Sequence, residues 1–399
     1  WVLSPKIHIK LSVMKQSDIK FAILPILFGF FVMGFVDVVG ISTNYVKHDF
    51  GLSDTLANLI PMMVFLWFAV FSIPAGMLMG RIGRRNTVAV SLGITIVAML
   101  LPLFFYDFTS VLLAFALLGI GNTILQVSLN PMVASVVSPG KVTSVLTLGQ
   151  FLKAVSSFLG PLIAGAAASF WGDWKLIFAV YAATTLLSLV WLLVGVHEEG
   201  KKTVQTSTFA TVCSLFKDRY IGMLFLGILF IVGIDVGLNT TVPKLLIEKT
   251  GMSVSEAGLG SSLYFSARTI GAFIGAFLLA RIASDRFMQC CMGIAVIGFV
   301  LLLMADSLLW ISILVVIVGL ACSNVFSIIF SYALQHLPER DNEISALMIM
   351  GVSGGALITP LMGVLSDALG QVAGLSLLLL CLLYLGWISF RLQKRKKNV

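Results

Sequence analysis

The chain has 399 residues, of which 59% are hydrophobic and 11% charged, with a mean hydropathy of +1.04 and a net charge of +8. Soluble globular chains are about 45–50% apolar and about 25% charged, so this composition excludes a chain with a water-facing surface. The positive charges lie at the ends and between apolar runs, which argues against a nucleic-acid-binding patch.

Apolar runs long enough to cross a bilayer follow one another along the whole chain. They predict an all-α membrane protein with twelve transmembrane helices in two six-helix bundles. The predicted spans are 19–46, 56–80, 87–106, 109–137, 143–170, 175–196, 220–247, 256–282, 287–305, 308–335, 343–367 and 372–390.

The polar segments between these spans predict the domain boundaries. The longest of them, 197–219, is predicted to link an N-terminal bundle over 19–196 to a C-terminal bundle over 220–390. Residues 1–18 and the basic residues 391–399 are predicted to be cytoplasmic. The first apolar run is long and is followed by further spans, so it is predicted to be a helix rather than a cleaved signal peptide.

The lysines and arginines are distributed unevenly between the two sides of this predicted topology. With the N-terminus inside, twenty of them lie on the cytoplasmic side, and four lie outside: Lys47, Lys175, Lys244 and Lys249. Because cytoplasmic loops are enriched in positive charge, this distribution places both termini in the cytoplasm. We expect a multi-pass protein of the bacterial inner membrane.

The two halves repeat each other at an offset near 200 residues. Gly51-Leu52-Ser53 recurs as Gly251-Met252-Ser253, and Gly119 recurs as Gly319. Because each half has six predicted helices, both halves enter the membrane in the same orientation. Such parallel repeats place a solute site between the halves, near the middle of the membrane.

One loop carries a known signature. The segment 76–85 reads GMLMGRIGRR and resembles the loop signature of major facilitator transporters, with Gly80 where the signature has aspartate. Asp37 and the segments 126–131, 148–150, 326–330 and 350–370 resemble the fucose permease family of sugar:proton symporters. The resemblance extends over about 19–390.

This resemblance implies the import of a sugar by cation symport, with a proton as the expected cation, through alternating access. The expected partners are this small-molecule substrate, the coupling cation and membrane lipid, without nucleic acid, and a monomer is expected. Its helix 1 aspartate matches Asp37, whereas Gln126 replaces a helix 4 glutamate and Lys153 replaces a helix 5 asparagine.

Four charged residues lie within predicted spans: Asp37, Lys153, Asp235 and Arg268. A charge in the middle of a membrane span costs at least ~2.5 kcal/mol on insertion, so such residues face a cavity or a partner. Asp37 is predicted to be the proton-coupling carboxylate, paired with Lys153 in one conformation. Alternatively, Lys153 contacts an anionic substrate.

The remaining polar side chains within the spans predict a substrate site. Asp235 is expected to accept hydrogen bonds from sugar hydroxyls, and Arg268 either binds substrate or pairs with Asp235 as a structural contact. Amides supply both donors and acceptors, and aromatic rings stack on the apolar face of a sugar. The further predicted substrate-binding residues are Asn44, Gln126, Asn130, Gln150, Asn239, Tyr264, Asn324 and Tyr332.

Alternatives to a sugar symporter remain open at this level. A partial glycine–proline motif at 156–165 is compatible with a drug:proton efflux antiporter, although Lys153 would repel cationic drugs. A transporter of an acidic sugar and a non-transporting nutrient sensor are also possible. The sequence has no nucleotide loop, metal cluster or nucleophile–base set, so we expect no enzyme, cofactor or metal site.

Overall fold

The computed structural model describes residues 16–52, 56, 59–196, 208–252 and 259–396, and these residues form helices and connecting turns without strands. The first half contains α1 (Gln16–Met33), η1 (Gly34–Val38), α2 (Val39–Asp49), α4 (Leu59–Ile82), α5 (Arg84–Phe104), α6 (Phe108–Val136), η2 (Pro139–Lys141), α7 (Val142–Trp171) and α8 (Leu176–Gly195). The label η denotes a 3₁₀ helix.

The second half has the same plan. It contains α10 (Arg219–Thr250), α12 (Leu259–Leu278), α13 (Ser284–Met304), α14 (Leu308–Cys322), α15 (Val325–His336), η4 (Pro338–Arg340), α16 (Asp341–Met350), η5 (Gly351–Ser353), α17 (Gly354–Leu369) and α18 (Gln371–Lys396). Between the halves lie α9 (Phe209–Ser214) and η3 (Leu215–Lys217). Residues 197–207 of the expected linker fall outside the described residues, so the domain boundaries stay predictions.

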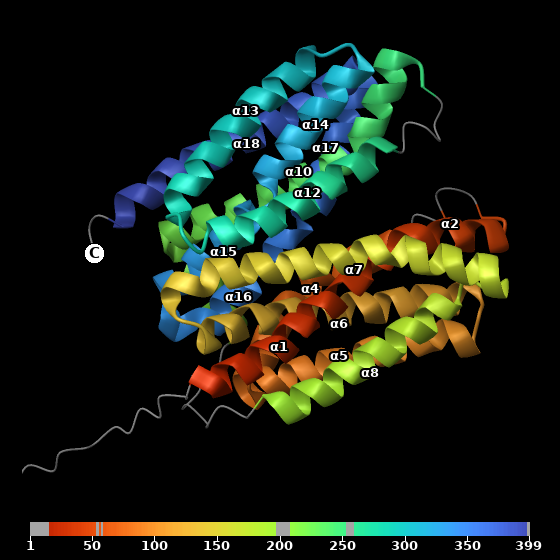
Figure 1. Ribbon diagram of the computed structural model, residues 1–399, viewed down its shortest axis with the longest axis vertical. Coiled ribbons are helices and arrows are strands. Elements are labelled where there is room, and N and C mark those ends of the chain that lie inside the picture. The colour runs from red at the N-terminus through yellow and green to blue at the C-terminus, as the bar shows by residue number, and fades with distance from the viewer. Residues whose placement is uncertain (1–15, 53–55, 57–58, 197–207, 253–258, 397–399) are drawn as a thin grey trace, which may run out of the picture.

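The helices form two bundles that meet along α7 (Figure 1). In the first bundle, α5 packs against α6 and α8, and α1 packs against α6, α7 and α8. In the second, α13 packs against α14 and α18, and α10 packs against α17 and α18. Between the bundles, α7 contacts α12 and α15, while α16 contacts α4 and α6.

The outer surface of both bundles is apolar. Large side chains such as Phe170, Val194 and Met304 are more than 70% exposed, which water would disfavour and lipid tails accept. Within the described residues, ten helical segments are long and apolar enough to cross a membrane, and 262–278 is a shorter apolar helix. The all-α membrane fold predicted from the composition is therefore confirmed.

Three predicted spans are interrupted helices. The span 19–46 contains the 3₁₀ segment η1, 308–335 breaks between α14 and α15, and 343–367 contains η5. Apolar runs do not reveal such breaks, because a 3₁₀ turn needs no change in hydrophobicity. Mid-helix 3₁₀ segments often mark functional positions, and η1 contains Asp37.

The internal repeat is visible in matching backbone features. Gly51 and Gly251 both adopt positive φ, at 59° and 68°, just beyond the ends of α2 and α10. A Cβ atom on Gly119 would lie 2.5 Å from the Val64 carbonyl oxygen, and one on Gly319 would lie 3.1 Å from that of Tyr264. The same helix contacts therefore occur in both halves, 200 positions apart.

The two bundles are joined at the end that is predicted to face the cytoplasm. Thr143 donates to Ser331 over 2.7 Å, and Ser144 donates to the carbonyl oxygen of Ala276 over 2.6 Å. Both bonds connect the first turn of α7 with helices of the other bundle. Figure 1 shows the bundles diverging from this end toward the end that carries α2.

The signature loop takes part in this closure. Arg84 forms an ion pair with Asp341 and donates to Asn342 over 3.1 Å, both at the start of α16. It also donates to the carbonyl oxygen of Pro131 in its own bundle over 3.3 Å. The ion pair is largely buried, with 14% and 19% of its two side chains exposed, so screening by solvent is weak.

Candidate functional site

The break in the first transmembrane helix positions Asp37. Asn122 on α6 donates to the carbonyl oxygen of Met33, the last residue of α1, over 2.7 Å. Gly34 then allows η1 to pack directly on α7, because a Cβ atom there would collide with the carbonyl oxygen of Lys153. This close packing brings Asp37 to the side chain of Ser157.

Asp37 is exposed although it lies in the middle of a membrane-crossing segment. Its Oδ2 atom accepts a hydrogen bond from Ser157 on α7 over 2.5 Å. Lys153, one turn before Ser157, is half-buried and lies more than 4 Å from any carboxylate of the described residues. The predicted pair between Asp37 and Lys153 is therefore not formed in this conformation, and it stays a prediction for another one.

A second charged cluster lies in the other bundle. Arg268 on α12 forms an ion pair with Asp235 on α10, with 2.6 Å between Nη1 and Oδ2. Tyr264, one turn before Arg268, donates to Oδ1 of Asp235 over 2.7 Å. The expected structural pair between Arg268 and Asp235 is thus present. Its partners offset the cost of placing Asp235 in the membrane.

The two clusters lie on helices that pack against each other across the interface. Lys153 and Ser157 lie on α7, which packs against α12, the helix that carries Arg268. In this way, each half contributes one acid and one base to a shared region. Asp37, which is bonded to Ser157, therefore lies beside the helix that packs against α12 of the other bundle.

Three of the predicted substrate-binding amides are buried. Gln126 donates to Asn122 over 2.7 Å, and Asn130 donates to the carbonyl oxygen of Gln126 over 2.7 Å. Asn324 donates to the carbonyl oxygen of Gly271 over 3.0 Å. These side chains are at most 4% exposed, so here they satisfy backbone and helix packing, and their contact with substrate stays a prediction.

The other predicted residues are dispersed. Tyr264 is fully buried and serves Asp235, so its ring does not face an open space. Gln150 and Asn239 are half-buried, while the side chain of Asn44 lies outside the described part of the chain. Tyr332 lies beside Asp285, at the predicted cytoplasmic end, and is not brought together with the charged clusters.

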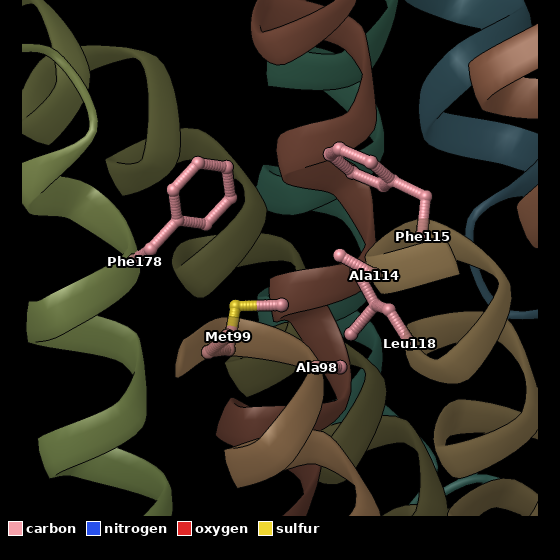
Figure 2. Close-up of a pocket in the computed structure, with 6 residues that line it drawn as sticks. All are labelled: Ala98, Met99, Ala114, Phe115, Leu118 and Phe178. Carbon is pink, nitrogen blue, oxygen red and sulfur yellow. The ribbon is translucent and has the colours of Figure 1, made fainter. Parts of the chain in front are cut away.

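Two aromatic rings pack against each other between the two bundles. Phe151 on α7 and Phe273 on α12 lie with ring centroids 4.9 Å apart, between the charged clusters and the hydrogen bonds of the first α7 turn. The pocket in Figure 2 is a different feature, an apolar gap between α5, α6 and α8. Its lining has no polar side chain and it is too small for a water molecule, so it is not the solute site.

Ser157 and Asn122, which hold the segment around Asp37, were not among the predicted site residues. The signal for Ser157 was its spacing of four residues from Lys153, which places both on one face of a helix. Asn122 gave a weaker signal, since a buried amide in α6 fits many packing roles. Contacts between residues this far apart in the chain follow from the packing of helices and not from any local pattern.

Two apolar bundles with charged side chains at their shared interface define an α-helical membrane transporter rather than an enzyme. The family model of the Major Facilitator Superfamily matches residues 26–245 and 224–399. The chain therefore belongs to the Major Facilitator Superfamily, as the signature loop and the repeat predicted.

Curated relatives match along nearly the whole chain. A glucose/galactose transporter of Brucella abortus is 25% identical over 392 residues, covering 93% of this chain and 94% of its own. A putative glucose/galactose transporter of Helicobacter pylori is 26% identical over 400 residues, covering 92% and 96%. Both relatives are named as transporters of sugars.

A solved structure confirms the fold independently. The crystal structure of the Escherichia coli fucose:proton symporter matches with a TM-score of 0.80, covering 93% of this chain and 98% of its own. At 18% identity this likeness shows the fold alone. The resemblance to the fucose permease family is thus supported by relatives as well as by architecture.

Proposed function

We propose that the protein imports a sugar together with a proton by alternating access between its two bundles. The observation that carries this proposal is the state of Asp37, which is exposed within a membrane-crossing segment, hydrogen-bonded to Ser157 and without an ion pair among the described residues. The names of the relatives, glucose/galactose transporters, support a sugar as the substrate.

The exposure of Asp37 suits a proton carrier. The Asp37 side chain is exposed in the present conformation, and we propose that water reaches it from the end that is predicted to face outward. Closing the bundles over an ionised carboxylate removes it from water, which is costly unless the charge is neutralised. Proton binding removes that cost, so closure follows loading of the proton. Lys153, which lies one turn of α7 before Ser157, is proposed to pair with Asp37 after the proton leaves.

One observation favours a sugar acid as a second candidate substrate. Among the described residues, Lys153 has no ion pair and the buried Nε of Arg268 has no hydrogen-bond partner. Two cationic groups with unused donors at one interface would bind a carboxylate as well as hydroxyl groups. Neutral sugars and their acids therefore belong in the same uptake experiment.

The test is uptake into proteoliposomes that contain the purified protein. The substrates are radiolabelled glucose, galactose, fucose and glucuronate, each with an inward proton gradient, an inward sodium gradient, or neither. We expect one of these sugars to accumulate only with the proton gradient. Accumulation driven by sodium would contradict proton coupling, and transport of none of the four would contradict the proposed substrate class.

Variants of the coupling residues sharpen this experiment. Asp37→Asn should abolish accumulation while preserving exchange of labelled for unlabelled sugar, because a neutral amide mimics the proton-loaded state. If Lys153 pairs with Asp37 during the cycle, the effects of Lys153→Met and Asp37→Asn should be non-additive in the double variant. Normal accumulation by Asp37→Asn would refute its role.

The location of the protein is part of the proposal. A multi-pass transporter with this distribution of lysines and arginines is expected in the bacterial cytoplasmic membrane with both termini inside. The closed end of the structure then faces the cytoplasm.

A further inference from the structure

Ser157 has one hydroxyl group among three oxygen atoms from two helices. Its Oγ atom lies 2.5 Å from Asp37 Oδ2, 2.9 Å from the carbonyl oxygen of Lys153 and 3.5 Å from that of Gly34. A hydroxyl group donates a single proton, so only one of these contacts is a full hydrogen bond at a time. The charge of an ionised Asp37 makes its carboxylate the strongest acceptor of the three.

Protonation of Asp37 reverses this arrangement. A hydronium ion transfers a proton to Oδ2 and becomes water, and the neutral acid then donates to Oγ of Ser157. The hydroxyl proton of Ser157 is released from the carboxylate and turns to the carbonyl oxygen of Lys153, four residues earlier in α7. One O–H bond of the hydronium ion breaks as the O–H bond of Asp37 forms, and no other covalent bond changes.

We propose that Ser157 is a positioning residue that transmits the protonation of Asp37 to the backbone of α7, an inference that rests on the proposed coupling role of Asp37. The place of transmission is the tightest contact between η1 and α7, where the carbonyl oxygen of Lys153 faces Gly34. The same helix also carries contacts to the other bundle through Thr143 and Phe151. A change in α7 at Lys153 therefore reaches the interface.

Apart from Ser157, the charged and titratable groups around Asp37 must stay constant in any test. They are Lys153, one turn before Ser157 on α7, Tyr181 on α8, and Arg268 on α12 in the other bundle. Tyr181 is 2% exposed, and its hydroxyl has no hydrogen-bond partner among the described residues. Conservative changes at Ser157 leave these charges and dipoles in place.

The experiment is an infrared titration of the purified full-length protein without any sugar. The carboxyl band of Asp37 is identified by its absence in Asp37→Asn, and its pH midpoint is measured in each variant. In Ser157→Ala we expect this midpoint to rise by about one pH unit, because the ionised carboxylate loses a charge-assisted hydrogen bond. Ser157→Thr, which keeps the hydroxyl, should restore the original midpoint.

Two further variants separate this role from general packing. Ser156→Ala removes a neighbouring buried hydroxyl that has no partner among the described residues. The midpoint of the Asp37 band should therefore not move in this variant. Ser157→Cys supplies a weaker donor and should give an intermediate rise, which provides a second reading if Ser157→Ala does not fold.

The possible results are distinct. An unchanged midpoint in Ser157→Ala and Ser157→Cys, or an equal rise in Ser156→Ala, would overturn the inference. The absence of any Asp37 band that titrates would overturn both this inference and proton coupling. A midpoint that depends on Ser157 in a protein that accumulates no sugar would support the relay and contradict the proposed function.

Discussion

At the scale of single residues, the two acids Asp37 and Asp235 compensate in different ways for the loss of hydration within a membrane. Asp235 is paired with Arg268 and bonded to Tyr264, whereas Asp37 is exposed and bonded to Ser157. Pairing makes a buried charge tolerable but also holds it in place. Asp37, which has no ion pair among the described residues, is therefore the acid that we propose as the proton carrier.

An acid outside the spans illustrates the same physics with a measurable pH dependence. Asp49, at the end of α2, accepts hydrogen bonds from Tyr106 over 2.6 Å and from Trp174 over 3.0 Å. Partial burial raises the pKa of Asp49, but the hydrogen bonds outweigh it and hold this pKa below the usual value. An acid whose pKa falls on folding stabilises the protein above its unfolded pKa, about 3.9, and this stabilisation is lost as the pH falls through the folded value.

Tyr106→Phe should therefore lower stability in a pH-dependent manner. We expect a loss of about 1 kcal/mol at pH 7, because the ionised Asp49 loses its shortest hydrogen bond, and little loss once the acid is protonated. Apparent unfolding temperatures in detergent at neutral and acidic pH measure this difference. Tyr45→Phe is the control, since the Tyr45 ring stacks on Trp174 while its hydroxyl has no partner among the described residues. Equal losses for Tyr106→Phe at both pH values would count against this account.

At the scale of helices, the sequence predicted where apolar segments cross the membrane but not where they break. The spans 19–46 and 343–367 were predicted as continuous helices, and the structure interrupts them with η1 and η5. Periodicity and hydropathy report the environment of side chains, and a lipid-embedded chain is apolar on either side of a break. The position of a break depends instead on which helix packs against it.

Two glycines in the first transmembrane segment distinguish the effect of close helix packing from the effect of helix propensity. A Cβ atom on Gly34 would collide with the carbonyl oxygen of Lys153 and lie 2.8 Å from Cβ of Ser156, whereas one on Gly40 would meet nothing within 4 Å. Gly34→Ala should cost about 1–3 kcal/mol, because α7 must move away from η1. Gly40→Ala should be neutral or stabilise by about 0.5–1 kcal/mol, since glycine within a helix is unfavourable.

Apparent unfolding temperatures of the two variants and the parent protein test this contrast. Gly34→Ala should also slow sugar uptake, because Asp37 and Ser157 lie on the displaced surfaces. A lower unfolding temperature for Gly40→Ala than for Gly34→Ala would show that the contact between η1 and α7 is not the tight one.

At the scale of the whole molecule, contacts at one end hold the two bundles together. The ion pair between Arg84 and Asp341 joins the signature loop to α16, and Ser345 donates to the carbonyl oxygen of Val127 over 2.6 Å. These contacts must break for the opposite state to form. Their strength therefore contributes to the equilibrium between the two states.

Arg84→Gln should shift this equilibrium away from the closed end. We expect at least a tenfold change in the ratio of the two states, about 1.4 kcal/mol, because Asp341 loses its cationic partner. Distances between spin labels at Ser138 and Glu339, which are exposed on opposite bundles, report the separation of this end. Arg85→Gln is the matched control, because Arg85 donates to the carbonyl oxygen of Leu193 within its own bundle. An unchanged distance distribution in Arg84→Gln would refute the role of the ion pair.

The sequence alone determined that this protein lies in a membrane, that it consists of two repeated helical halves and that four charges sit within its spans. These properties follow from composition, span length and spacing, because a bilayer admits few backbone solutions. The tertiary structure alone decided that Asp37 meets Ser157 rather than Lys153, that Arg268 pairs with Asp235, and that Arg84 joins the bundles at one end. Such pairings depend on how helices far apart in the chain are rotated and how closely they approach each other. Hydropathy contains no information on either the rotation or the distance.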